Sequence, residues 1–255
     1  MQDELIGQAD AIYRAREHIE GPTIILFSDT LFETDLDAVN RTDADAIIYA
    51  REVEDPRRFG VVELNDEGRI TRFIEKPDTT ENKNAVIGLY YVREGEDLIA
   101  AIEEQMARNQ MTKGEFYLAD AFQIMIENGA DFRSEPVDVW LDCGKPETVL
   151  ETNRHLLENG YDNSASVQVK GVTVIAPSNV HPSATLENAI IGPYATIGKG
   201  CEVRNSIIQD SVVDDGATVQ HMLLNESLIG RDVHVVGRHH TLNVGDSSTI
   251  DFGEC

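Results

Sequence analysis

The sequence predicts an α/β domain over residues 1–160, followed by an all-β solenoid over residues 166–250. In the first part, stretches with helical spacing alternate with apolar runs of strand length, as expected for a sheet layered with helices. In the second part, single aliphatic residues recur every five or six positions, separated by Gly, Pro, Asn, Asp and Ser. Such steps fit neither a helix nor a hairpin sheet, but they fit a solenoid of short strands.

The first elements of the α/β part are a helix over 8–19 and a strand over 23–28. The strand is a continuous apolar run, which is typical of a strand buried on both faces, and residues 45–50 repeat this pattern. Residues 61–64 and 70–74 then alternate with a period of two, and an Asp-Glu-Gly turn lies between them. These two segments therefore predict a β-hairpin.

The later elements of this part are a strand over 86–92, helices over 97–108 and 116–128, a strand over 137–141 and a helix over 146–159. Apolar residues at helical spacing predict the first of these helices. Gly129 is placed to cap the carboxyl end of the second helix, and Pro146 suits the first turn of the third.

Twelve aliphatic residues of the second part are predicted to point into the solenoid core. They are Ile175, Val180, Leu186, Ile191, Ile197, Val203, Ile208, Val213, Val219, Leu224, Ile229 and Val235. Residues 191–203 form the clearest coil, and the steps of five are interpreted as shortened corners. The segment resembles the left-handed parallel β-helix of hexapeptide-repeat proteins. From Arg238 onward the period is lost.

Composition narrows the classes of function. The chain has 255 residues and a formal net charge of -25, which argues against nucleic-acid or anionic-membrane partners because both require a basic surface. No apolar run approaches the roughly 20 residues of a membrane span, and the first residues lack the features of a signal peptide. Cys143, Cys201 and Cys255 show neither paired nor metal-type spacing, which suits a reducing compartment. We therefore expect a cytoplasmic protein.

Two aspartates follow predicted strands and could share a metal ion. Asp29 comes directly after the strand over 23–28, and Asp142 follows the strand over 137–141 just before a glycine turn. Carboxyl ends of strands are where α/β sheets place their ligands, although such an aspartate can equally cap a turn. Together they could hold one Mg²⁺, which prefers one or two protein carboxylates and completes its coordination with phosphates and water. This arrangement suits nucleotidyl transfer, in which catalysis is mostly alignment and charge neutralisation.

The predicted hairpin ends in a Glu75-Lys76 pair before Pro77. An edge hairpin with a solvated charge pair is the simplest explanation. However, Gly60 opens the hairpin and Glu-Lys-Pro closes it, and this combination resembles the sugar-recognition segment of the sugar-phosphate nucleotidyltransferase family. The resemblance implies that Gly60 and Glu75 bind sugar hydroxyls and that Lys76 lies near the sugar phosphate.

Further segments are similar to motifs of the same family. Gln2 and Gly7 match the Gln-x-x-x-x-Gly-x-Ala segment that grips the nucleobase, so the resemblance assigns nucleotide binding to them. The tripeptide at 28–30 looks like the family's Gly-Asp-Asn, with Asp29 as metal ligand and Thr30 in place of the usual Asn.

The segment from Val86 to Tyr90 is similar to the Val-x-Gly-Leu-Tyr motif, which places both residues at the sugar phosphate. Val86 disfavours the branch of N-acetylglucosamine 1-phosphate uridylyl enzymes, which tend to carry Asn there. The sequence Trp-Leu-Asp-x-Gly around Asp142 resembles the second metal motif, which thymidylyl, adenylyl and guanylyl members share. It therefore supports the superfamily without indicating the nucleotide.

The chain also departs from the family. Members open with a strand and a Gly-Gly-x-Gly-Thr-Arg loop, followed by Pro-Lys, which wrap the triphosphate and supply the catalytic cations. This sequence has neither, so the catalytic residues are unknown and the implied fold is a truncated doubly wound, Rossmann-like sheet. We expect the intact gene product to be longer, or the chain to be poorly active alone. The strand over 23–28 would then be an exposed apolar edge.

The resemblance predicts a Mg²⁺-dependent transferase, most like the long form of glucose-1-phosphate thymidylyltransferase, which carries a left-handed β-helix. It would transfer a nucleotide from a nucleoside triphosphate, with dTTP favoured, to a hexose 1-phosphate, with glucose 1-phosphate favoured. The products would be a nucleotide-sugar and pyrophosphate. We also expect a homo-oligomer that assembles through the β-helix.

Three alternatives stay open. The first is a non-catalytic, nucleotide-sugar-binding or regulatory subunit, and the second is an enzyme like mannose-1-phosphate guanylyltransferase. The third is acyl transfer by the solenoid, which would use a histidine base. The solenoid histidines are His181, His221, His234, His239 and His240, and no motif distinguishes one of them from a surface or turn histidine. Residues 113–120 resemble the start of a family helix, for which capping is the simpler explanation.

Overall fold

The computed structural model describes Glu4 and residues 6–238 of the chain. Contacts between residues divide the chain into two compact units, Met1–Gly144 and Lys145–Cys255. The helix α5 (Pro146–Leu156) groups with the second unit by its contacts. The predicted domain boundary at residue 160 stays a prediction. Across the described part of the chain, every helix is too short or too polar to cross a membrane.

The first unit is built on a six-stranded sheet with the order β5-β4-β6-β3-β7, and β1 pairs with β6 outside this order. The strands are β1 (Thr23–Leu26), β3 (Ala46–Glu52), β4 (Gly60–Leu64), β5 (Ile70–Glu75), β6 (Asn84–Val92) and β7 (Phe132–Pro136). The long strand β6 is antiparallel to β3, to β1 and to β4, whereas β3 and β7 run parallel.

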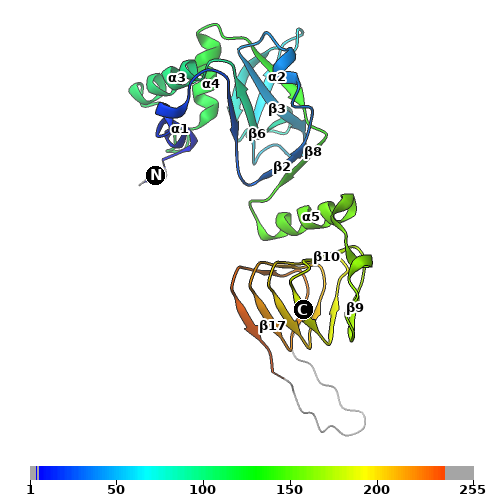
Figure 1. Ribbon diagram of the computed structural model, residues 1–255. Coiled ribbons are helices and arrows are strands. Elements are labelled where there is room, and N and C mark those ends of the chain that lie inside the picture. Colours follow the sequence, from blue (N-terminus) through cyan, green and yellow to red (C-terminus); the bar gives the residue numbers. More distant parts are fainter. Residues whose placement is uncertain (1–3, 5, 239–255) are drawn as a thin grey trace. The chain divides into compact units, whose positions relative to one another are not determined.

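Both faces of this sheet are covered, as in a Rossmann-like α/β layer (Figure 1). The helices α1 (Gln8–Tyr13), α3 (Gly95–Ala107) and α4 (Leu118–Glu127) pack on one face. The short helix α2 (Ala38–Arg41) and the antiparallel ribbon of β2 (Thr30–Glu33) and β8 (Val139–Asp142) cover the other. The sheet therefore separates two apolar cores.

Strand β3 shows how the sequence divides between these cores. Ala46 and Ile48 pack into the core beneath the helices, whereas Ile47 and Tyr49 pack into the core beneath the ribbon. Successive side chains of a strand point to opposite faces, so a continuous apolar run is needed where both faces are covered. The prediction of a buried strand over 45–50 is therefore confirmed.

The prediction that residues 23–28 are buried on both faces is wrong. Ile24 and Leu26 are 55% and 51% exposed, whereas Ile25 and Phe27 pack on the helix-side core. The strand β1 bonds to β6 along one side, so it forms an edge with one open apolar face. The alternative expectation of an exposed apolar edge describes this strand correctly.

Several elements differ in extent from the sequence prediction. The helix expected over 8–19 ends as α1 at Tyr13 and continues as a short 3-10 turn over Arg16–His18. Residues 14–18 are exposed, so no packing supports a longer helix. The hairpin is confirmed as β4 and β5, whereas β2, α2 and β7 were not predicted because they are short and lack a clear period.

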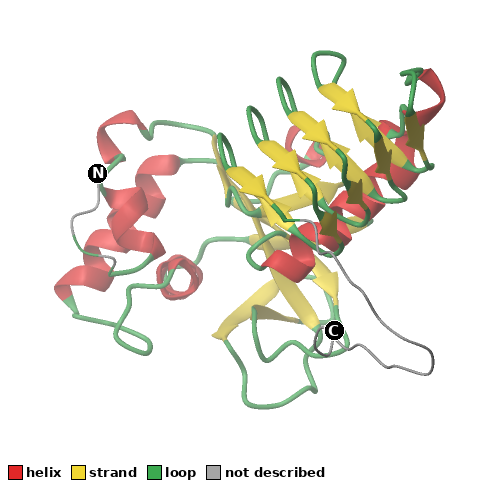
Figure 2. Cartoon of the chain, turned by 90° about the horizontal axis from the view of Figure 1, so that it is seen from below, coloured by secondary structure: helices red, strands yellow, loops and turns green. Residues whose placement is uncertain are grey.

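The second unit is a parallel β-solenoid whose strands form three four-stranded sheets, seen as stacked rows in Figure 2. Its strands are β9 (Val172–Val174), β10 (Ser178–Val180), β11 (Thr185–Glu187), β12 (Ala189–Ile191), β13 (Ala195–Ile197), β14 (Glu202–Arg204), β15 (Ile207–Ile208), β16 (Val212–Val213), β17 (Thr218–Gln220), β18 (Leu223–Leu224), β19 (Leu228–Ile229) and β20 (His234–Val236). The helix α5 packs on this solenoid, where Asn153 Nδ2 donates to the Tyr194 carbonyl over 3.0 Å and Arg154 Nε donates to Asp210 Oδ1 over 2.7 Å.

Eleven of the twelve predicted inward residues are buried or half-buried, and Ile175 is the exception at 42% exposed. Val174 takes its place, because it pairs in register with the fully buried Ile191. A shift of one residue moves a side chain to the other face of a strand.

The predicted shortened corners are also present. Five of the six predicted steps of five contain one residue other than glycine with a positive φ, and the sixth, 175–180, becomes a step of six when it is counted from Val174. These residues are Asn188, Asn205, Asp210, His221 and Glu226. A single left-handed residue turns the chain sharply, and Asn, Asp and His tolerate this conformation better than most residues.

Candidate functional site

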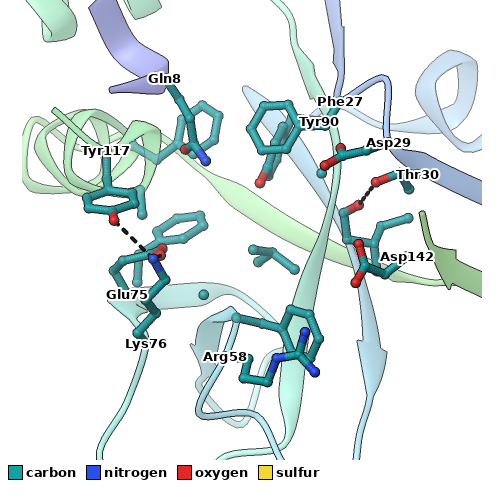
Figure 3. A pocket seen from close by; sticks show the side chains of 18 of the residues that line it. Gln8, Phe27, Asp29, Thr30, Arg58, Glu75, Lys76, Tyr90, Tyr117 and Asp142 are labelled. Carbon is teal, nitrogen blue, oxygen red and sulfur yellow. Dashed lines mark hydrogen bonds and ion pairs between the residues drawn. The ribbon is translucent and has the colours of Figure 1, made fainter. Parts of the chain in front are cut away.

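A cavity of about 300 Å³ lies within the first unit (Figure 3). Seven of the nine residues predicted to form the site line it, and they are Asp29, Gly60, Glu75, Lys76, Val86, Tyr90 and Asp142. Gly7 is not among the lining residues, although its neighbour Gln8 is. The remaining predicted residue, Gln2, lies outside the described residues. The fold therefore gathers residues from β4, β5, β6, β8 and the end of β1 around one space.

One wall of the cavity carries the two aspartates. The register of the β2–β8 ribbon sets Thr30 opposite Asp142, so Asp29 lies next to the end of β8. The Asp29 carbonyl accepts a 2.8 Å hydrogen bond from the Cys143 amide, which joins the two loops. The Gly144 amide donates to Asp142 Oδ1 over 3.0 Å and holds that side chain in place.

Gly144 shows how close the two carboxylates are to a common point. A Cβ added to Gly144 would lie 3.1 Å from Asp142 Oδ1 and 3.7 Å from Asp29 Oδ2. Two carboxylates that converge in this way match the oxygen ligands of a hard divalent cation. Within the described residues, no group of three or more His, Cys, Asp or Glu is placed to hold a metal ion. A cation bound here would therefore take most of its ligands from a substrate or water.

The opposite wall is formed by the end of the β4–β5 hairpin, where Gly60 pairs with Glu75. A Cβ on Gly60 would lie 3.0 Å from Glu75 Oε2 and 3.1 Å from Val86 Cγ2. A larger residue at position 60 would therefore have to displace the Glu75 carboxylate or the Val86 methyl group from the space above it. Burial raises the pKa of Glu75, and the neighbouring Lys76 ammonium opposes this effect.

Lys76 directly follows β5 and has a φ of 46°, the left-handed region that few lysines adopt. Its amide donates to the Phe59 carbonyl over 3.0 Å, which fixes the turn. Its Nζ donates to the Tyr117 hydroxyl over 3.1 Å and lies 5.1 Å from the centre of that ring. The same Nζ is 3.9 Å from Glu75 Oε1. The hydrogen bond to Tyr117 is the main reason that the pKa of Lys76 is raised.

Aromatic side chains form the interior of the cavity between these walls. The rings of Phe27 and Phe122 pack at 5.7 Å and 5.2 Å from the ring of Tyr90. Gly88, with a φ of 83°, makes this possible, because a Cβ there would lie 2.8 Å from the Phe27 ring. Burial raises the pKa of Tyr90 further above neutral pH, where a tyrosine hydroxyl is already protonated.

The lining residues that the sequence did not assign to the site include Gln8, Arg58, Tyr117 and Trp140. Tyr117 lies in the segment over 113–120, for which helix capping is the simpler explanation, and it occupies the cap position of α4 without a side-chain capping hydrogen bond. Its proximity to Lys76 could not be inferred, because the two residues come from separate elements. The sequence did offer a signal for Arg58, because it lies only two positions before the predicted site residue Gly60.

The solenoid histidines show no shared site among the described residues. His181 and His234 are exposed and His221 is half-buried at a corner. His239 and His240 lie outside the described residues. The structure thus gives no support to the alternative of acyl transfer.

The comparisons identify the class of protein that this fold and site define. The family model described as nucleotidyl transferase matches residues 1–159, so the chain belongs to that family.

Among curated proteins, the chain is similar to glucose-1-phosphate thymidylyltransferase of Streptomyces antibioticus, with 27% identity over 98% of this chain and 78% of the relative. It is equally similar, at 27% identity over 98% and 78%, to the low-salt glycan biosynthesis nucleotidyltransferase Agl11 of Haloferax volcanii. A solved structure, the nucleoside-diphosphate-sugar pyrophosphorylase of Vibrio cholerae RC9, matches with a TM-score of 0.50 and 17% identity, over 59% of this chain and 66% of that one. At that identity it supports the fold.

Proposed function

We propose that this chain carries out nucleotidyl transfer from a nucleoside triphosphate to a hexose 1-phosphate, giving a nucleotide-sugar and pyrophosphate. The favoured substrates are dTTP and glucose 1-phosphate, as in the named activity of the Streptomyces relative. The observation that carries the proposal is that one cavity has charged groups on two opposite walls. Asp29 and Asp142 lie on one wall, and Glu75 and Lys76 lie on the other (Figure 3).

The Glu75 wall would bind the sugar. Its carboxylate is 3.9 Å from Lys76 Nζ, which is too long for a direct hydrogen bond, so its oxygens can accept hydrogen bonds from sugar hydroxyls. The missing side chain of Gly60 and the methyl groups of Val86 would let the sugar ring approach this carboxylate closely. The Tyr90 hydroxyl, which lines the cavity, would be available as a donor.

The Lys76 ammonium would bind the sugar phosphate, and Asp29 and Asp142 would hold a divalent cation, which we propose to be Mg²⁺. When bound, such a cation would neutralise charge on the phosphates and orient them. This contribution matters because the chain has a formal net charge of -25. The chain's own part would be alignment, since Glu75 fixes the sugar and Lys76 fixes its phosphate.

Nucleobase binding is proposed for Gln2 and Gly7. Gly7 has a φ of 120°, and a Cβ there would lie 2.4 Å from the Phe116 carbonyl oxygen, so only glycine fits. This close approach holds the segment before α1 against the segment before α4. The next residue, Gln8, lines the cavity, where its side chain could contact the base.

Pyrophosphate release tests the reaction. The chain is incubated with Mg²⁺, glucose 1-phosphate and each of the four nucleoside triphosphates in turn, and release with dTTP is expected to exceed the others. Asp142→Asn should abolish release, whereas the matched control Asp138→Asn, an exposed aspartate just before β8, should leave it unchanged. The same assay is run on a chain extended at its amino terminus by the family's glycine-rich loop, and silence of that extended chain with all four nucleotides would contradict the transferase proposal.

Calorimetric titration with nucleotide-sugars separates the leading proposal from the two remaining alternatives. Binding of dTDP-glucose without any turnover would favour a non-catalytic or regulatory subunit. Preference for GTP and mannose 1-phosphate in the release assay would favour a guanylyltransferase-like enzyme.

Assembly into a homo-oligomer through the solenoid is also a proposal. Ile190, Ile207 and Leu223 are paired across neighbouring coils and form an exposed apolar row. Light scattering on the wild type and on Leu223→Glu tests it, with a smaller particle expected for the variant.

A further inference from the structure

Tyr117 and Lys76 form a contact that the sugar and metal assignments leave unexplained. The Lys76 side chain is 39% exposed, and its ammonium could turn toward Glu75, which precedes it in the chain. Instead, Nζ donates to the Tyr117 hydroxyl over 3.1 Å and stays 3.9 Å from Glu75 Oε1. The ammonium therefore contacts a neutral phenol more closely than an adjacent carboxylate.

Tyr117 is itself held firmly. It is 5% exposed and occupies the position before the first turn of α4. Its backbone carbonyl accepts a 3.0 Å hydrogen bond from Gln105 Nε2, and Gln105 on α3 is fully buried. A flexible lysine is thus tied to a side chain that two helices fix in place.

Holding Lys76 on Tyr117 has a consequence for Glu75. An ammonium that closed onto the carboxylate would occupy the lone pairs that sugar hydroxyls need, and its own charge would be neutralised. In the observed arrangement the carboxylate and the ammonium both face the cavity (Figure 3). The Tyr117 hydroxyl accepts from Lys76, so its own proton can be donated to a ligand oxygen.

We propose that Tyr117 is a positioning residue that keeps Lys76 off Glu75 and presents the ammonium and the phenol together to the phosphate of a sugar phosphate. The proposal rests on the assignment of the cavity to a hexose 1-phosphate. It deepens that assignment, because it makes Tyr117 a determinant of selectivity for phosphorylated over free sugars.

The charged groups around the pair agree with this role. Glu75, Tyr117 and Glu115 interact with Lys76, and Asp120 and Lys113 add to the field at Glu75. The largest contribution to the raised pKa of Lys76 comes from Tyr117 and not from either carboxylate. The raised pKa of Glu75 likewise fits a carboxylate that the ammonium only partly neutralises.

The variant Tyr117→Phe tests the proposal, because it removes the hydroxyl and keeps the ring. We expect the affinity for glucose 1-phosphate, measured by calorimetry, to fall roughly tenfold, as for loss of one charge-assisted hydrogen bond. We also expect the pKa of Glu75, followed by carboxyl-carbon NMR, to fall because Lys76 closes onto it. The control is Tyr13→Phe, which removes a 3.2 Å hydrogen bond from Tyr13 to Glu103 outside the cavity, and it should change neither quantity.

A double-mutant cycle shows whether Tyr117 acts through Lys76. In a Lys76→Met background, Tyr117→Phe should cause little further loss of affinity. Equal affinity and an unchanged Glu75 pKa in Tyr117→Phe would overturn the proposal, as would additive losses in the cycle. If the wild type binds no glucose 1-phosphate, the proposed function fails, and the Glu75 titration still decides whether Tyr117 holds Lys76 away.

Discussion

Thr30 and Asp142 face each other as paired residues of the β2–β8 ribbon. This register brings the residue before Thr30, Asp29, to the turn that follows Asp142, where the Cys143 amide binds the Asp29 carbonyl. The two carboxylates come from segments that are far apart in the sequence. A backbone pairing, rather than a direct contact between the carboxylates, therefore sets their position.

The space between these carboxylates should be sensitive to one methyl group. In Gly144→Ala, the new Cβ would lie 3.1 Å from Asp142 Oδ1 and 3.7 Å from Asp29 Oδ2. We expect the affinity for Mn²⁺, measured by electron paramagnetic resonance, to fall roughly tenfold because the methyl group displaces one ligand. The control is Gly230→Ala, where the nearest atom would be 3.8 Å away. Undiminished Mn²⁺ affinity in Gly144→Ala would argue against a shared cation.

The raised pKa of Glu75 should make the free energy of unfolding depend on pH. Its pKa is raised in the folded state, mainly by burial, so the folded state holds the proton more tightly than the unfolded state. The contribution to the free energy of unfolding is thus present at low pH and is lost as the pH rises through the raised pKa. Glutamine has no carboxyl group to ionise, so Glu75→Gln does not lose stability as the pH rises. The variant should therefore be more stable than the wild type at pH 7, and the two should be closest in stability near pH 4.

Urea denaturation at both pH values measures this difference. The same variant should lose affinity for glucose 1-phosphate, because an amide is a poorer acceptor for sugar hydroxyls. Glu81→Gln, at an exposed position, serves as the control and should leave both quantities unchanged. Equal stabilities of wild type and Glu75→Gln at pH 7 would mean that burial does not penalise the Glu75 charge.

Two neighbouring residues of β12 test the register of the solenoid. Ile191 is fully buried, whereas Ile190 is 37% exposed. Ile191→Ala should lower the free energy of unfolding by about 2–5 kcal/mol through lost burial and the cavity left behind. Ile190→Ala should cost less than about 1 kcal/mol. Chemical denaturation of both variants checks this, and similar losses would contradict the inward assignment of Ile191.

Periodicity in the sequence was sufficient to predict much of the fold. The alternation over 61–64 and 70–74 gave the hairpin, and the steps of five and six gave the solenoid and its shortened corners. These features arise from neighbouring residues, whose φ preferences and side-chain directions are determined locally. The order of motifs also sufficed to name seven residues that line one cavity.

Other features depended on packing that no local pattern contains. Ile175 and Val174 are both aliphatic, and only pairing with Ile191 decides that Val174 points inward. The run over 23–28 looks buried on both faces, yet its place at the sheet edge leaves Ile24 exposed. In each case the sequence fits two environments, and the neighbouring strand selects one.

By itself, the sequence determined the two kinds of architecture, the family resemblance and the identity of the carboxylates and the Glu75-Lys76 pair. The tertiary structure alone decided how these groups are held: Tyr117 beside Lys76, and Asp29 beside Asp142. The physical reason is the range of the interactions. Turns and strand periods arise between adjacent residues, whereas the geometry of the cavity depends on strand register and helix packing between distant ones.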